Sequence, residues 1–181
     1  MNLKPNVSRK KYNLLKNLRQ NFFMCSENNR HKNGTEWRNF YGRFKGKSLS
    51  ATQTKALLTE FEKYSLQNIS WEENPLRNQV KLSEIFDEKP VWLEIGFGGG
   101  EHLIHQARLN PDIGFIGCEP YQNGVAKLMG KLNANPCQNI KLYDGDVRNI
   151  FDVLAKNSIS KVFLLYPDPW PKKRHHRRRF V

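Results

Sequence analysis

The chain of 181 residues carries a formal net charge of +13, and 38% of its residues are hydrophobic. It is long enough for one folded domain with extensions. No apolar stretch approaches the roughly 20 residues that cross a bilayer, so we expect neither a membrane span nor a secretory signal. Cys25, Cys118 and Cys137 have no CxxC spacing. We therefore expect neither disulfides nor structural zinc, and we expect a reducing, cytoplasmic compartment.

Positive charge gathers at both ends of the sequence. Residues 1–50 hold twelve Lys and Arg against two acids, and residues 172–181 hold six against none. Residues 51–171 hold twelve basic and fifteen acidic residues. This division suits a protein that binds a polyanion through its ends and a cationic ligand through its centre. The alternative is a charge excess that serves solubility alone.

The first half of the chain is expected to carry little core. Residues 1–36 are basic and polar, which predicts a disordered extension with one short helix at 10–24, although an organelle transit peptide remains an alternative. Residues 37–90 form a predicted helical docking segment, in which basic and aromatic residues alternate over 38–48. A helix should then begin after Ser50 and run to about residue 64.

Residues 91–181 alternate between short apolar runs and helical segments, which predicts an α/β fold. We expect a partial Rossmann-like domain made of the first four parallel strands with crossover helices. Asn-Pro pairs at 110–111 and 135–136 should end two of the helices. The predicted strands are 91–96, 113–119, 140–146 and 161–167, and the predicted helices are 100–109, 121–134 and 148–157.

An acidic residue stands at or near the end of each predicted strand: Glu94, Glu119, Asp146 and Asp168. The carboxyl ends of parallel strands meet at one edge of a sheet, where ligands bind. The four carboxylates are therefore expected to face one cationic ligand. Glu119 is placed to bind both hydroxyls of a ribose, or is an ordinary polar strand terminus; Asp146 belongs beside a base, or to a turn.

A glycine-rich turn follows the first predicted strand, with Gly96, Gly98 and Gly100 at alternate positions. A dinucleotide fingerprint needs G-x-G-x-x-G, but its third glycine falls on Glu101. A phosphate-binding P-loop needs a closing Gly-Lys-Ser/Thr, which is missing. Both nucleotide readings are disfavoured. The pattern Glu-x-Gly-x-Gly-x-Gly that begins at Glu94 instead resembles the first motif of class I S-adenosylmethionine-dependent methyltransferases.

A second resemblance is more specific. The segment Tyr-Pro-Asp-Pro-Trp-Pro-Lys-Lys-Arg-His at 166–175, with Gly-Arg-x-x-Gly-Lys at 42–47, closely resembles the bacterial tRNA (guanine-N7-)-methyltransferase family. The resemblance covers about residues 38–181. It implies methyl transfer from S-adenosylmethionine to N7 of a guanosine in the variable loop of tRNA, with tRNA as partner.

The resemblance also implies roles for particular residues. Asp168 would be catalytic and would contact the cofactor, and Lys172 would contact the substrate. The cofactor would further contact Glu94, Gly96, Gly98, Glu119 and Asp146, and the RNA would contact Arg174, His175, His176, Arg177, Arg178 and Arg179.

Two features have readings that the sequence leaves open or disfavours. Trp170 could stack on a base or cap the core. His102 and His105 lack the H-E-x-x-H spacing, so we expect no metal site.

The resembled family continues beyond this point with another helix and three strands. We therefore expect a C-terminally incomplete sheet with an open apolar edge, or a second polypeptide that supplies the missing strands. Alternatives are a non-catalytic RNA-binding remnant or fragment, and an enzyme that methylates another RNA or a small molecule.

Overall fold

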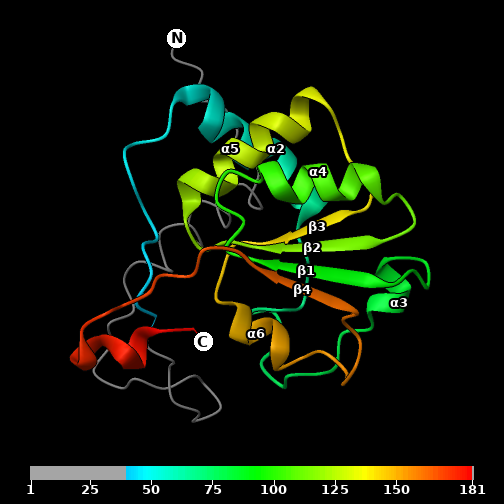
Figure 1. The fold of residues 1–181 in the computed structure, drawn as a ribbon. Helices are drawn as coiled ribbons and strands as arrows, with labels where there is room; N and C mark the ends of the chain where they lie inside the picture. The colour runs from blue at the N-terminus through cyan, green and yellow to red at the C-terminus, as the bar shows by residue number, and fades with distance from the viewer. Residues whose placement is uncertain (1–39, 181) are drawn as a thin grey trace. The chain divides into compact units, whose positions relative to one another are not determined.

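The computed structural model of the chain describes residues 40–180 (Figure 1). Its sheet has four parallel strands in the order β3-β2-β1-β4. This arrangement confirms the predicted Rossmann-like α/β fold. The elements in chain order are α2 (Ala51–Tyr64), α3 (Leu82–Ile85), β1 (Val91–Ile95), α4 (Glu101–Leu109), β2 (Gly114–Cys118), α5 (Gln122–Ala134), β3 (Ile140–Tyr143), α6 (Val147–Phe151), β4 (Lys161–Leu164) and the 3₁₀ helix η1 (Lys173–Arg178).

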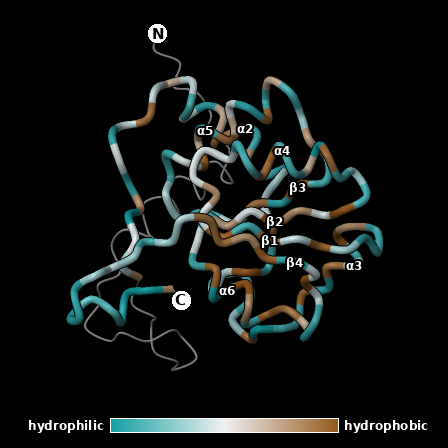
Figure 2. The backbone as a smooth tube through the Cα atoms, in the orientation of Figure 1, coloured by the Kyte–Doolittle hydropathy of each residue, from teal (hydrophilic) through white to brown (hydrophobic). Residues whose placement is uncertain are grey.

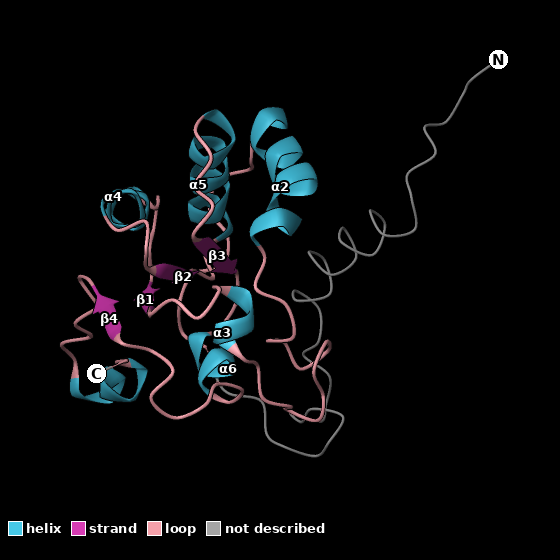
Figure 3. Cartoon of the chain, turned by 90° about the vertical axis from the view of Figure 1, so that its right-hand side faces the viewer, coloured by secondary structure: helices cyan, strands magenta, loops and turns pink. Residues whose placement is uncertain are grey.

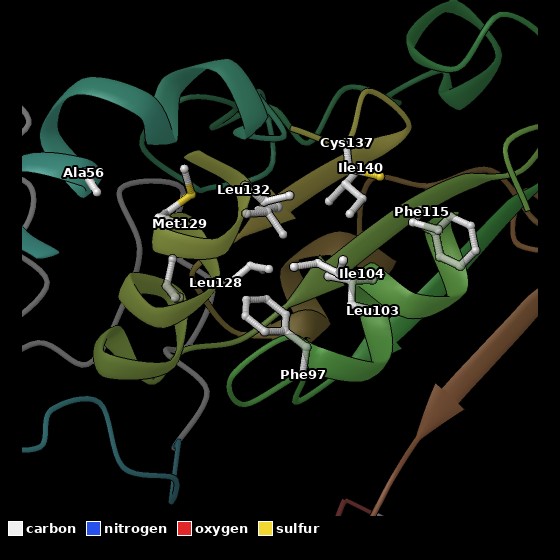
Figure 4. Close-up of a cluster of buried hydrophobic side chains, with 13 residues drawn as sticks. Ala56, Phe97, Leu103, Ile104, Phe115, Leu128, Met129, Leu132, Cys137 and Ile140 are labelled. Carbon is white, nitrogen blue, oxygen red and sulfur yellow. The ribbon is translucent and has the colours of Figure 1, made fainter. Parts of the chain in front are cut away.

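Helices cover both faces of the sheet. Helices α2, α4 and α5 lie on one face, and α3 and α6 lie on the other (Figure 3). Successive side chains of a strand point to opposite faces, so Phe115 joins the core under α4 and α5 whereas Ile116 joins the core beside α6. Figure 4 shows the first of these cores, where Leu103 and Leu128 pack towards the sheet. Burial on both faces explains why β1, β2 and β3 are apolar runs, as Figure 2 shows.

Several predicted boundaries are confirmed. Helix α4 ends at Leu109 and α5 ends at Ala134, and each is capped by an asparagine that precedes a proline. Helix α2 begins directly after Ser50, whose hydroxyl accepts a hydrogen bond from the Gln53 amide at 3.2 Å. The Gln53 side chain accepts in return from the Ser50 amide at 3.0 Å. This capping box fixes the start of the helix.

Three elements are shorter than predicted. Strand β3 ends at Tyr143, because Asp146 turns the chain and caps α6. Helix α6 ends at Phe151 rather than at 157, since the chain near Val153 extends to receive a hydrogen bond from the Val80 amide. Strand β4 ends at Leu164, opposite the last residue of β1. The short helices α3 and η1 were not predicted.

Strand β4 is one of the two edge strands of the sheet within the described residues. It pairs with β1, and its Val162 side chain is 51% exposed. The next residue after the strand, Leu165, is 39% exposed. The predicted apolar edge is therefore present in the described part of the chain. The predicted disorder of residues 1–36 and the helix at 10–24 lie outside the described residues. Within residues 40–180, no helix has the length and apolar character needed to cross a membrane.

Candidate active site

The four acidic residues lie at the carboxyl ends of the four strands. Glu94 is the penultimate residue of β1, and Glu119 directly follows β2. Asp146 caps α6 after β3, and Asp168 lies on the loop after β4. Glu94 and Glu119 are 3% and 8% exposed, whereas Asp168 is exposed. Glu94, Glu119 and Asp146 thus lie at the carboxyl end of the sheet, each with its own hydrogen-bond partners, whereas Asp168 lies on the loop after β4.

Glu119 joins the glycine turn to the start of α5. Its Oε2 accepts a hydrogen bond from the Gly98 amide at 2.8 Å, and its Oε1 accepts from the Tyr121 amide at 2.9 Å. A carboxylate has about four acceptor positions, so two remain for hydroxyl donors of a ligand. This carboxylate can therefore hold the turn and bind a ligand at once.

Glu94 is paired with His102 on the first turn of α4. His102 Nδ1 lies 2.8 Å from Glu94 Oε2, and the His102 side chain is 32% exposed. The imidazole also meets the Phe163 ring edge-on, at 4.8 Å between centroids. His102 is thus held between the buried carboxylate and a side chain of β4, so the orientation of Glu94 depends on two neighbouring elements.

Burial raises the pKa of the Glu94 carboxyl, and the hydrogen bond and charge of His102 oppose this rise only in part. Burial also raises the pKa of the Glu119 carboxyl, against the opposing effect of the Tyr121 and Gly98 amides. A buried carboxylate gains when a cation replaces the water it has lost. The electrostatics of this edge therefore favour a positively charged ligand over a phosphate.

The glycine turn presents open backbone. Gly96 and Gly98 have φ of 73° and 56°, in the left-handed region that favours glycine. A Cβ placed on either one would meet no atom within 4 Å. The space beside the turn is therefore free for a ligand to approach the backbone next to Glu94 and Glu119.

Gly124 lets helix α5 approach this turn. A Cβ at Gly124 would lie 2.4 Å from the Gly98 carbonyl oxygen, a backbone atom that cannot move without moving the turn. In the same helix, a Cβ at Gly130 would meet nothing within 4 Å. The close approach of Gly98 thus requires glycine at position 124, whereas no contact requires glycine at position 130.

We expect Gly124→Ala to lower the free energy of unfolding by about 1–3 kcal/mol through overpacking. Gly130→Ala is the matched control and should raise it by about 0.5–1 kcal/mol, because alanine favours helix. Urea unfolding followed by circular dichroism measures both. Equal effects of the two substitutions would contradict the close approach of α5 to the turn.

Asp146 is held by its own helix. Its carboxylate accepts from the Arg148 amide at 2.9 Å and forms a salt bridge with the Arg148 guanidinium. Beside it, the Cys118 thiol donates to the Gly145 carbonyl oxygen at 3.2 Å, which ties this turn to β2. The turn that the sequence allowed at 144–146 is present. The contact of Asp146 with a base stays a prediction.

The basic segment after Asp168 divides into two sets. Lys172, Arg174, His176 and Arg177 are exposed, whereas Arg178 is partly buried. Trp170 belongs to neither hydrophobic core and packs on side chains of η1. The core-capping reading of Trp170 is therefore wrong, while base stacking stays a prediction. Figure 2 shows the hydrophilic character of the chain near its end.

Residues 44–47 pack on the start of α5, beside Glu119. The Gln122 amide donates to the Phe44 carbonyl oxygen at 2.9 Å. The Asn123 side chain accepts from the Gly46 amide at 2.8 Å and donates to the Lys47 carbonyl oxygen at 2.7 Å. The Gly-Arg-x-x-Gly-Lys segment therefore lies against the same edge of the sheet as the carboxylates.

Two cavities in the described part of the chain lie away from the four acids. One of about 500 Å³ lies between α4 and α5, beside Ile104, His105 and Leu109. The other, of about 310 Å³, is lined by residues 79–83 and 155–160 among others. Across residues 40–180, no cluster of three or more His, Cys, Asp or Glu has the arrangement of a metal site.

Sequence reasoning missed the partners of the acids. The spacing of His102 and His105 disfavours them as metal ligands and does not pair His102 with Glu94. Its position eight residues after Glu94, on the first turn of the next helix, was the available signal. Arg148, two residues after Asp146, gave no comparable signal.

Comparison with known proteins identifies the family. The family described as "Putative methyltransferase" matches residues 88–181, which include all four acids. The chain belongs to this methyltransferase family. It is 55% identical over 152 residues to a protein of Ruegeria sp. (strain TM1040) named tRNA (guanine-N(7)-)-methyltransferase, covering 84% of this chain and 60% of the relative.

Other relatives agree. The methyltransferase of the same name from Roseobacter denitrificans is 59% identical over 80% of this chain and 62% of the relative. That from Agrobacterium fabrum is 46% identical over 78% of this chain and 60% of the relative. The resemblance seen in the sequence is thereby confirmed. The chain spans about 60% of the length of the methyltransferases that it matches.

Proposed function

We propose that this chain belongs to an enzyme that transfers a methyl group from S-adenosylmethionine to N7 of a guanosine in the variable loop of tRNA, in the cytoplasm. The observation that carries the proposal is the 55% identity over 152 residues to a tRNA (guanine-N(7)-)-methyltransferase. The site supports it independently, because buried carboxylates beside an open glycine turn suit a ligand that carries positive charge and no phosphate.

We assign cofactor binding to the carboxyl edge of the sheet. Glu94, Gly96, Gly98, Glu119 and Asp146 would hold the ligand, with the free acceptor positions of Glu119 for the ribose hydroxyls. The cofactor supplies a methyl group bonded to a positively charged sulfur. The chain's own residues bind it, orient it and fix the glycine turn.

Asp168 is proposed to act on the guanine. N7 carries an in-plane lone pair and no proton, so no general base is needed for its attack. The purine becomes positively charged as the new bond forms, and a carboxylate fixed nearby stabilises that charge. A rate that falls steeply below neutral pH, with tRNA binding unchanged, would instead indicate that the reaction needs a general base.

Cofactor affinity should rise with pH. A raised pKa means that Glu94 and Glu119 stay protonated to a higher pH in the free protein than exposed carboxyls do, whereas a cationic ligand favours the carboxylate. For folding alone the sign is opposite, because their contribution to stability is present below the ordinary value of 4.5 and is lost as pH rises through the raised pKa.

This pH dependence gives a measurement. Titration calorimetry with S-adenosylmethionine in buffers of different ionisation enthalpy should show proton release at pH values just above 4.5. Glu119→Gln should reduce the number of protons released. Proton uptake on binding would contradict the assignment of these carboxylates to the cofactor.

The alternative is an RNA-binding chain without catalysis, possible because the chain spans about 60% of its relatives and exposes apolar side chains on β4. A second polypeptide paired with β4 stays a prediction. Labelled methyl transfer to unmodified tRNA, with nucleoside analysis of the product, decides between the two functions. Formation of 7-methylguanosine supports the enzyme, and tRNA binding without product supports the alternative.

A further inference from the structure

The loop that carries Asp168 has a backbone that needs external support. Tyr166 and Trp170 have φ of 52° and 38°, which non-glycine residues adopt at a conformational cost. Prolines at 167, 169 and 171 lack the amide hydrogens that would let the loop bond to a neighbouring strand. Something outside the loop must hold Asp168 in place.

Helix η1 folds back and supplies part of this support. Arg179 Nε donates to the Pro169 carbonyl oxygen at 2.8 Å, and a terminal nitrogen of the same guanidinium donates to the Trp170 carbonyl oxygen at 3.3 Å. His175 meets the Trp170 ring edge-on, at 5.6 Å between centroids. Pro169 and Trp170, the two residues after Asp168, are therefore held by η1 and by Arg179, which directly follows it.

Arg178 supplies the rest through two aromatic rings. Its guanidinium carbon lies 5.1 Å from the Trp170 ring centroid and 5.2 Å from that of Tyr41. Its Nε is buried and has no hydrogen-bond partner among residues 40–180. The guanidinium of Arg178 therefore interacts with the two aromatic rings and not through a hydrogen bond from Nε. Its exposed neighbour Arg177 lacks such burial.

Tyr41 connects Arg178 and Trp170 to the carboxyl end of the sheet, where Glu119 lies. It lies three residues before Phe44, whose carbonyl oxygen receives the Gln122 amide of α5. The rings of Phe40 and Phe44 pack together at 4.5 Å between centroids, which stiffens the intervening backbone. Residues 40–47 thus run from the Asp168 loop to the helix that follows Glu119.

We propose that Arg178 is a positioning residue, which holds the Asp168 loop against Tyr41 and does not bind tRNA phosphate. This role rests on the proposed function only for the expected fall in the rate of methyl transfer. It replaces, for this one residue, the RNA contact that the family resemblance implies. The cation joins the loop to residues 40–47, so that Asp168 keeps its place relative to the edge where Glu119 lies.

The test compares Arg178→Ala with Arg177→Ala, which removes the same charge one residue away. The full chain is labelled with 5-fluorotryptophan, and the Trp170 signal is assigned through Trp170→Phe. We expect Arg178→Ala to shift the fluorine signal of Trp170 and to change tRNA affinity less than twofold. Arg177→Ala should leave that signal in place and weaken tRNA binding several-fold, with a shallower salt dependence.

A second variant guards against misfolding. Tyr41→Leu removes the other ring without changing charge, and it should also move the Trp170 signal and leave tRNA affinity unchanged. In an active preparation, both Arg178→Ala and Tyr41→Leu should lower kcat at least about tenfold with little change in the KM for tRNA, since the loop that bears Asp168 loses its support.

The outcomes are separable. An unmoved Trp170 signal in both variants, or a loss of tRNA affinity in Arg178→Ala equal to that in Arg177→Ala, would overturn the positioning role. If the unmodified chain transfers no methyl group, the proposed function fails, but the fluorine spectra and tRNA affinities still decide the role of Arg178.

Discussion

Replacing Asp168 with asparagine is expected to slow methyl transfer to tRNA by about 10²–10³-fold at saturating substrates, the usual cost of removing one preorganised electrostatic contact. Asparagine keeps the size of the side chain and removes its charge, so the developing positive charge on guanine loses its partner. Affinity for tRNA should stay the same or increase slightly, because a negative charge near a polyanion is removed. Single-turnover transfer of labelled methyl measures the rate.

Asp112→Asn is the matched control. Asp112 is exposed and precedes β2, so it lies at the amino end of the sheet, whereas Asp168 lies beyond the carboxyl end. The Asp112→Asn variant loses the same charge as Asp168→Asn, and it should transfer methyl as fast as the unmodified chain does. A rate for Asp168→Asn within threefold of that control would remove Asp168 from the catalytic machinery and leave it as a loop residue.

Glu119→Gln is expected to weaken the binding of S-adenosylmethionine by about 10- to 100-fold, the range for losing a hydrogen bond to a charged group. Both carboxylate oxygens accept from backbone amides, Gly98 on one side and Tyr121 on the other. A glutamine must point its NH₂ group at one of these two N–H donors. The glycine turn or the start of α5 then moves, and an acceptor for the ligand is lost.

Titration calorimetry with S-adenosylmethionine measures this change. Glu84→Gln in α3 is the control. Glu84 is exposed, and within residues 40–180 its one salt bridge is to Lys81, which is exposed too. It should bind the cofactor as the unmodified chain does. Unchanged affinity for S-adenosylmethionine in Glu119→Gln would mean that Glu119 stabilises the glycine turn without binding the cofactor.

The sequence predicted the sheet well because a parallel strand buried on both faces leaves a strong local pattern. Apolar runs ended at Glu94 and Glu119, and Asn-Pro pairs marked the ends of α4 and α5. Strand β3 is shorter than predicted, because the side chain of Asp146 caps the next helix instead of ending the strand. An acidic residue after an apolar run fits both roles, and only the backbone decides between them.

The partners in the site were harder to predict, because they depend on contacts between distant residues. A run of basic residues suggests RNA contact, yet nothing local to Arg178 shows that Tyr41, far earlier in the chain, lies on its guanidinium. The same holds for Gly124, whose need for glycine comes from the carbonyl oxygen of Gly98. Spacing within one element cannot reveal such constraints.

The most direct test of methyl transfer to guanine N7 compares two transcripts of one tRNA, one made with guanosine and one with 7-deazaguanosine, in which carbon replaces N7. The chain should bind both transcripts and transfer labelled methyl from S-adenosylmethionine only to the first. Equal labelling of the two would show that another atom accepts the methyl group, and labelling of neither, with both bound, would show that this chain binds tRNA without modifying it.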